Sequence, residues 1–219
     1  MTKIQSSVWK FLDENPSIRK MIQYNIVNKR GLAKYIINEK KIYVPVDSVI
    51  SAIRRYKIDE NEDYSQKAIE MIKKTKSITS RSDISKIVLV KDSDVQKVLP
   101  DLFKIIRYNR GDVLRIIQGD GFIEVLTDSK NYDRVKDVFP QEKIIESSGN
   151  LSEIKINLTE EQSKTPGIIA IISNKLAAYK INVIEILACY LEYSWFVKQE
   201  DLMTAYKLIY DLCKSQGNS

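Results

Sequence analysis

The feature that most constrains the fold of this chain is a pattern of strands and helices that is written twice. In residues 84–146, apolar runs of strand length alternate with amphipathic helical stretches in the order βαββα, and one more strand candidate follows. The same order returns in residues 151–212, where no final strand is evident. A repeat of about 70 residues is too long for a solenoid unit. We therefore expect two small open-faced sandwiches, each with helices on one face of an antiparallel sheet.

The expected elements are short. The first copy should hold strands at 84–90, 112–118, 122–126 and 143–146, and helices at 95–108 and 132–138. The second copy should hold strands at 151–158, 183–189 and 193–197, and helices at 167–179 and 202–212. A polar, partly β-branched stretch at 77–82 is predicted as a short edge strand.

Four short amphipathic helices are expected in residues 1–60. Ser6 or Ser7 can cap the first, Pro16 suits the first turn of the second, and the third begins near Asn28. The fourth should cover residues 48–57.

Charge separates this segment from the rest of the chain. Residues 1–60 carry 12 basic and 6 acidic side chains, whereas residues 61–219 carry 23 of each. Such asymmetry suggests a part that meets a polyanion, although a solvated lysine-rich surface would give the same count. The predicted architecture is α+β: a helical head at 1–60, a linker helix and connector at 61–82, and two copies at 83–148 and 149–219.

Composition excludes several classes of site. The chain has no histidine and only two cysteines, Cys189 and Cys213, which are too few ligands for a zinc site. Without histidine it also lacks the base for Ser-His or Cys-His catalysis. We expect a non-enzymatic protein without catalytic residues, metal or cofactor. No apolar run is long enough to span a membrane, and the start lacks a secretory signal. A cytoplasmic protein with no membrane partner is expected.

A candidate ligand site lies in the second copy. Pro166 and Gly167 begin a helix whose free N–H groups could receive a carboxylate, and Asn182 stands just before a strand. These motifs, with the strand at Phe196 to Lys198, resemble the ACT regulatory domains of aspartate kinases over about residues 151–215. The resemblance implies side-by-side pairing of domains and an amino-acid effector. It places the effector against two segments: Thr165, Pro166, Gly167 and Ile168, and Asn182, Val183 and Ile184. The alternative is that Pro166 and Gly167 only start a helix and Asn182 only ends one.

The first copy departs from this pattern. Residues 92–94, Asp-Ser-Asp, replace the Pro-Gly loop, Asp112 takes the place of Asn182, and Pro100 falls inside the helix. Acidic groups would repel a carboxylate, so we expect the first copy to be a structural partner without an equivalent pocket.

The head resembles a helix-turn-helix with its second helix at residues 48–57. Its polar and basic side chains could meet phosphates and base edges of duplex DNA: Lys29, Arg30, Lys34, Ser48, Ser51, Arg54, Arg55 and Lys57. Similar spacing also occurs in ordinary helical bundles, and paired arginines often follow a helix C-terminus.

Over its whole length the chain resembles archaeal ACT-domain proteins with a helix-turn-helix-like head. No Gly-rich phosphate loop is present, so the resemblance does not extend to kinase activity. The predicted function is a homo-oligomeric, ligand-responsive transcriptional regulator. The alternative is a regulatory or scaffolding subunit that acts through protein contacts of its ACT sheets, without DNA.

Overall fold

The computed structural model describes residues 3–57 and 64–214. It divides into two compact units, Met1–Asp63 and Tyr64–Ser219. Each unit has its own hydrophobic core and is described separately.

Four helices form the first unit: α1 (Lys3–Glu14), α2 (Pro16–Gln23), α3 (Lys29–Lys40) and α4 (Val46–Arg54). As expected from the sequence, Pro16 opens α2 and α3 begins beside Asn28. The structure adds that the Asn28 side chain caps α3 by accepting the N–H groups of Arg30 and Gly31. The apolar stripes of α1, α3 and α4 meet in one small core, which includes Val8, Leu12, Ala33, Ile36 and Ile53.

Two helix ends differ from the prediction. Helix α1 begins at Lys3, so Ser6 and Ser7 lie inside the helix and cap nothing; Ile4 extends its apolar stripe onto the core. Helix α4 runs from Val46 to Arg54 and stops before Lys57. The chain leaves the helix here because Tyr56 turns back onto α1, where its hydroxyl donates to Asp13.

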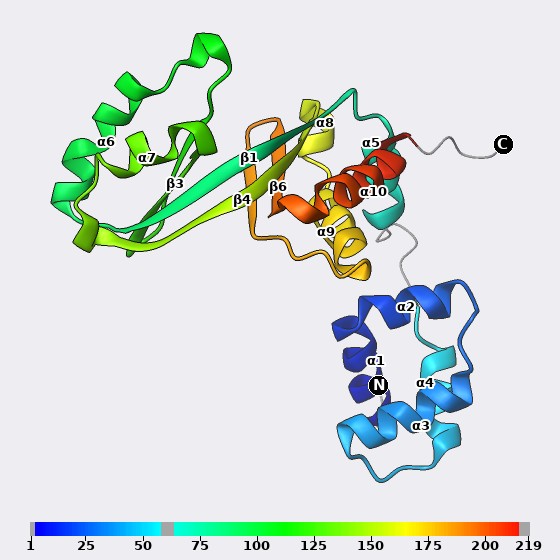
Figure 1. Cartoon of the computed structure of the whole chain (residues 1–219). Coiled ribbons are helices and arrows are strands. Elements are labelled where there is room, and N and C mark those ends of the chain that lie inside the picture. Colours follow the sequence, from blue (N-terminus) through cyan, green and yellow to red (C-terminus); the bar gives the residue numbers. More distant parts are fainter. Residues whose placement is uncertain (1–2, 58–63, 215–219) are drawn as a thin grey trace. The chain divides into compact units, whose positions relative to one another are not determined.

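One six-stranded antiparallel sheet organises the second unit, in the order β2-β3-β1-β4-β6-β5. The strands are β1 (Ser77–Val90), β2 (Leu114–Gln118), β3 (Phe122–Asp128), β4 (Ile144–Asn157), β5 (Glu185–Cys189) and β6 (Glu192–Lys198). The helices are α5 (Tyr64–Lys73), α6 (Ser93–Ile105), α7 (Tyr132–Lys136), α8 (Glu160–Ser163), α9 (Ile168–Ala178) and α10 (Leu202–Lys214). Figure 1 shows α6 and α7 gathered near one end of the paired strands β1 and β4, and α5, α9 and α10 near the other end.

Strands β1 and β4 are each 14 residues long, longer than predicted. Residues 77–82, predicted as an edge strand, are continuous with residues 84–90. Among the described residues, 77–81 pair with β4 alone, as an edge does, whereas residues 84–90 lie inside the sheet because they pair with both β3 and β4. Strand β4 likewise joins the predicted strands at 143–146 and 151–158. Near its middle each strand contains a residue in the left-handed region, Asp83 (φ 58°) and Asn150 (φ 55°). The pairing register shifts between Arg81 and Ile84. The two long strands therefore bend at these points.

The final strand that the second copy lacks is supplied by residues that precede the first copy in the sequence. Residues 77–81 of β1 pair with residues 153–157 of β4. Ala68, Met71 and Ile72 of α5 lie in the same core as α9 and α10, so this part of the expected connector at 61–82 is packed in the second copy. We call residues 84–148 the first half and residues 64–81 with 149–214 the second half. Each half contains four adjacent strands, with β1 and β4 shared between them.

Within residues 64–214, helices pack on one face of the sheet, the helix-covered face, and none of them contributes to the cluster on the other, which we call the helix-free face. On the helix-free face Ile84, Leu126, Leu151 and Phe196 form a buried cluster. Ile117 on the edge strand β2 and Leu187 on the opposite edge strand β5 both pack against it. Six strands in a flat sheet would hold the two edges about 24 Å apart. The sheet therefore curls toward its helix-free face. None of the described helices is both long and apolar enough to cross a bilayer.

Candidate ligand site and basic surface

A hollow of about 690 Å³ opens where the bend of β4 meets the end of β6 and the start of β5. Its lining contains two lysines, two glutamates, three amide side chains and two aliphatic side chains. These residues are Lys86, Glu146, Ser148, Gly149, Asn150, Leu151, Asn182, Ile184, Lys198, Gln199 and Glu200. Lys86 comes from β1 in the first half, and Asn182 to Glu200 come from the second half. The hollow therefore lies where both halves meet.

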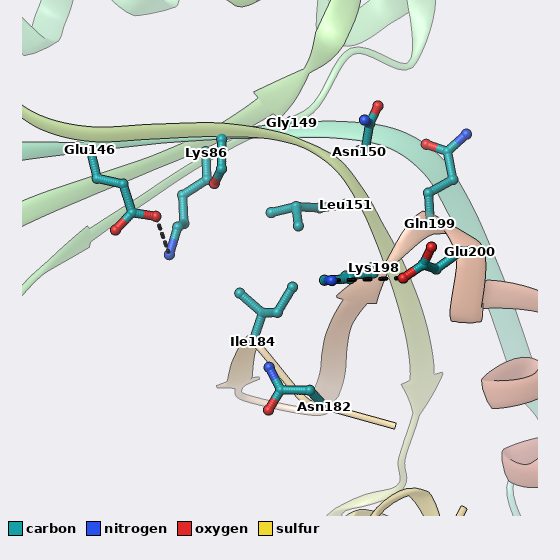
Figure 2. Close-up of a pocket in the computed structure, with 11 residues that line it drawn as sticks. Lys86, Glu146, Gly149, Asn150, Leu151, Asn182, Ile184, Lys198, Gln199 and Glu200 are labelled. Atoms are coloured by element: carbon teal, nitrogen blue, oxygen red, sulfur yellow. Dashed lines mark ion pairs between the residues drawn. The ribbon is translucent and has the colours of Figure 1, made fainter. Parts of the chain in front are cut away.

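Two ammonium groups flank the apolar floor formed by Leu151 and Ile184 (Figure 2). Lys86 Nζ lies 3.6 Å from Glu124 and 4.0 Å from Glu146, and its side chain is 13% exposed. Lys198 Nζ lies 3.7 Å from Glu200 and is 63% exposed. All three distances are longer than a direct hydrogen bond, so each ammonium retains donors for another acceptor.

The polar groups of the hollow match a small zwitterion. Ammonium and amide N–H groups can hold a carboxylate, and the carboxylates of Glu146 and Glu200 can hold an ammonium group. Asn150 and Asn182 add amide donors and acceptors, while Leu151 and Ile184 offer a surface for an aliphatic side chain.

A buried carboxylate lies behind Lys86. Burial raises the pKa of Glu124 on β3, Lys86 opposes this shift, and Glu185 on β5 reinforces it. Glu124 and Glu185 belong to strands four positions apart in the sheet, about 19 Å if it were flat. Their direct interaction is a second sign of the curl, and it links the hollow to the interior of the helix-free face.

The seven predicted ligand residues are divided by the structure. Asn182 and Ile184 line the hollow, whereas Val183 packs against the hydrophobic core of the second half. Ile168 is also in that core, and the Thr165 hydroxyl donates to the Glu161 carbonyl oxygen. Pro166 and Gly167 are exposed at the start of α9, where Gly167 has φ 99°. No residue of 165–168 lines the hollow, so the chain itself does not bring the two predicted segments together.

Sequence reasoning missed Lys86 and Glu146 because their strands were assigned to the first copy alone. Lys198 was part of the quoted strand motif but was not selected as a ligand residue. The available signal was the absent final strand of the second copy, which implies that another segment must complete its sheet.

The carboxylate of Asp112, which takes the place of Asn182 in the first half, is already bonded to neighbouring groups of the chain. Lys130 Nζ lies 2.5 Å from its carboxylate, the Arg107 N–H donates to it at 3.1 Å, and Asn131 donates at 3.0 Å. The Lys130 bond, followed by these others, lowers the pKa of Asp112 to about 2. Similarly, Asp92 caps α6, so the Asp-Ser-Asp segment serves as a helix start.

The head carries a basic surface around a second hollow of about 700 Å³. Four predicted DNA-contacting residues line it, Lys29 and Arg30 at the start of α3 and Ser51 and Arg54 on α4. Asp47 also lines it, 3.9 Å from Arg30. The other predicted residues lie outside its lining: Lys34, Ser48, Arg55 and Lys57. Of the two adjacent arginines, Arg54 lines the hollow and Arg55, the C-cap of α4, does not.

Within the described residues, no cluster of histidine, cysteine, aspartate or glutamate side chains could hold a metal ion. Cys189 is exposed and Cys213 is buried, and burial raises the pKa of the Cys213 thiol.

No protein-family model matches the chain, and no curated protein matches it. Solved structures do match. The aspartate kinase of Clostridium acetobutylicum is 18% identical with a TM-score of 0.50, and the match covers 64% of this chain and 34% of the kinase. The regulatory subunit of aspartate kinase from Thermus thermophilus is 17% identical with a TM-score of 0.50, covering 63% of this chain and 97% of the subunit.

The chain thus corresponds to about a third of the kinase but to almost all of the regulatory subunit. At this identity the likeness concerns the fold. The mixed α/β fold with its curled antiparallel sheet is similar to that of this regulatory subunit. The archaeal relationship and the helix-turn-helix head expected from the sequence have no counterpart in these matches.

Proposed function

We propose that this chain is a non-enzymatic, ligand-responsive regulator that senses a small amino-acid-like zwitterion at the hollow between its two halves. The observation that carries the proposal is the pair of lysines, Lys86 and Lys198, on either side of an apolar floor with amide and carboxylate groups around it. The fold shared with aspartate kinase regulatory domains supports a regulatory role.

A ligand in this hollow would affect how the two halves meet. It would contact Lys86 on β1, the bend of β4, and Lys198 at the end of β6. Drawing Lys86 toward a ligand carboxylate would weaken its attraction to Glu124 on the helix-free face. The ligand would therefore bind one curvature of the sheet more tightly than another. Such a difference in affinity between two conformations is what a population shift requires.

The test is thermal unfolding of the whole protein with each of the twenty amino acids. A ligand at 100 times its dissociation constant stabilises by about 2.7 kcal/mol, enough for a clear shift in Tm. Lys198→Met should remove most of that shift. Lys164→Met, which deletes an exposed lysine outside the hollow, is the matched control. If no amino acid shifts the wild-type Tm, the zwitterion proposal is wrong.

We propose that the head binds duplex DNA. Its support is the gathering of Lys29, Arg30 and Arg54 around one hollow at the positive end of α3. Asp47 in the same hollow reduces the local charge, so binding should be modest and strongly salt-dependent.

Fluorescence anisotropy with duplex DNA at several salt concentrations tests this part. Arg54→Ala combined with Arg55→Ala should weaken binding and make the logarithmic salt slope shallower by roughly two. The control, Lys3→Ala with Lys10→Ala, removes the same charge from α1. Equal losses in both variants would indicate non-specific attraction, and no wild-type binding at low salt would eliminate the DNA proposal.

One observation favours the second candidate, a regulatory subunit that binds another protein. Large apolar side chains are exposed on the head, among them Ile26 (71%), Tyr24 (53%) and Tyr43 (102%). Such side chains suit a protein partner better than phosphates. Replacement of Tyr24 and Ile26 by serine should leave DNA binding intact under the first candidate and abolish partner capture under the second.

Homo-oligomerisation is also proposed. Strands β2 and β5 are the outermost strands of the sheet within the described residues, so each offers backbone groups for pairing. Light scattering should show at least a dimer at micromolar concentration, and a strict monomer would remove this proposal.

A further inference from the structure

The two halves are related residue by residue through the register of the sheet. Ile84 on β1 pairs with Asp128 on β3, and Leu151 on β4 pairs with Lys198 on β6. Both long strands place their left-handed residue one position earlier, at Asp83 and Asn150. The hollow at the bend of β4 therefore has a structural counterpart at the bend of β1.

Side chains at equivalent positions differ in charge. Three residues before the paired apolar position, β1 has Arg81 and β4 has Ser148. At the end of the neighbouring strand, the first half has Asp128 and the second half has Lys198. The site at the bend of β1 thus has its own cation and anion, Arg81 and Asp128, where the site at the bend of β4 has a short hydroxyl and a lysine, Ser148 and Lys198.

Arg81 bridges the site at the bend of β1, which we call the first-half site because the end of β3 in the first half closes it. Its Nη1 donates to Asp128 Oδ1 at 2.9 Å and to the Gly111 carbonyl oxygen at 2.8 Å. Gly111 immediately precedes Asp112, the counterpart of Asn182. The guanidinium therefore ties the bend of β1 to the end of β3 and to the loop before β2.

The bridge also divides the space. In place of one hollow of about 690 Å³ at the bend of β4, two hollows of about 650 and 320 Å³ lie at the bend of β1, and Arg81 lines both. Asp128 lines the larger one, and Val113 and Glu153 line the smaller one. At the bend of β4 the equivalent side chain is Ser148, which is too short to reach the end of β6 in the way that Arg81 reaches Asp128.

We propose that the Arg81 guanidinium is a tethered ligand, held in a cation site of the first half by Asp128 and the Gly111 carbonyl, at the place where the second half receives its effector. This inference rests on the proposed function only for the second half. It implies one effector site per chain, because the first-half site is already occupied by the chain itself.

Chemical rescue tests the cation site without any effector. Arg81→Ala should lower the Tm of the whole protein, and 10 mM methylguanidinium should raise the Tm of this variant by about 2–4 °C relative to its effect on wild type. Methylammonium at the same concentration, a cation without the planar fork, should give a smaller shift. Arg81→Ala with Asp128→Asn should lose the rescue.

Equal methylguanidinium shifts in wild type and Arg81→Ala would overturn the proposal, as would an unchanged Tm for Arg81→Ala itself. If Arg81→Ala does not fold, Arg81→Lys provides the second variant. A lysine can reach one acceptor but lacks the fork, so the Tm of Arg81→Lys should fall and methylguanidinium should not restore it. A wild-type Tm in Arg81→Lys would contradict the bridging role.

Transplanting the bridge provides an independent measurement. Ser148→Arg and Lys198→Asp together recreate the first-half pair in the second half. In a double-mutant cycle, the Tm of the double variant should exceed the additive expectation by about 2–4 °C. The cycle cancels repulsion between the new guanidinium and Lys86, because that repulsion is also present in the Ser148→Arg single variant.

Additive Tm changes would show that the two positions cannot form the bridge and would overturn the equivalence of the sites. Neither experiment contains an amino acid, so both outcomes are independent of the effector screen. A failed screen with successful rescue would leave the tethered ligand standing and remove only the proposed effector.

Discussion

Asp112 is a residue whose charged form is stabilised by folding. Its pKa is lowered to about 2 from an ordinary value of 3.8, chiefly by Lys130 and the Arg107 N–H. A lowered pKa contributes stability that is complete above pH 4 and is lost as pH falls toward 2. Asp112→Asn should therefore be less stable than wild type at pH 6, and the difference should shrink between pH 4 and pH 2.

Urea denaturation followed by the fluorescence of the buried Trp195 measures this difference. Asp120→Asn, at the exposed turn between β2 and β3, is the control and should shift neither the midpoint nor its pH dependence. A constant gap between Asp112→Asn and wild type at all pH values would show that the carboxylate charge is irrelevant.

Glu124 should behave in the opposite way. Burial and Glu185 raise its pKa, although Lys86 opposes them, so ionisation costs more in the folded state than in the unfolded state. Stability is then full below the ordinary pKa near 4.5 and falls as pH rises through the folded pKa. Glu124→Gln should be more stable than wild type at pH 7, with the advantage vanishing near pH 4. A less stable Gln variant at pH 7 would mean that attraction to Lys86 outweighs desolvation.

At the scale of elements, the bend of β4 depends on a residue that tolerates the left-handed region. Asn150 has φ 55°, a conformation that costs a β-branched residue about 1–2 kcal/mol. Asn150→Val should lower the free energy of unfolding by about that amount, whereas Asn150→Gly should stay within about 0.5 kcal/mol of wild type. Ser147→Val, three residues earlier on an exposed position of the same strand, should be neutral.

At the scale of the whole molecule, the second half depends on chain that precedes the first half. Residues 77–81 complete its sheet, and α5 contributes Ala68, Met71 and Ile72 to its core. A fragment of residues 64–219 should fold cooperatively. A fragment of residues 84–219 contains both sequence repeats, yet the core of its second half should not form because residues 77–81 of β1 and helix α5 are missing.

Circular dichroism melts of the two fragments make this comparison. Cooperative unfolding of the 84–219 fragment at the Tm of the longer fragment would contradict the shared-strand arrangement. Any increase in Tm that an amino acid causes in the whole protein should also be seen in the 64–219 fragment, since this fragment contains all lining residues of the hollow at the bend of β4.

Local pattern alone predicted several elements of this protein. The apolar spacing predicted the positions of α2, α3, β2, β3 and α9 to within a few residues, because periodicities of 3.6 and 2 report which face of a short segment is buried. Pro16 and Asn28 also act as predicted, since helix starts depend on neighbouring residues. The charge of the head is likewise a property of the sequence.

Only the tertiary structure decided how the two copies combine. Antiparallel pairing joins residues distant in sequence, so nothing in the local pattern of residues 77–81 shows that they pair with residues 153–157. The hollow depends on that pairing. Lys86 meets Asn182 and Lys198 because β1 and β4 are shared and the sheet curls, whereas Arg81 closes the corresponding place in the first half. Long-range pairing and curvature depend on contacts among many residues at once, and a sequence pattern records them only one segment at a time.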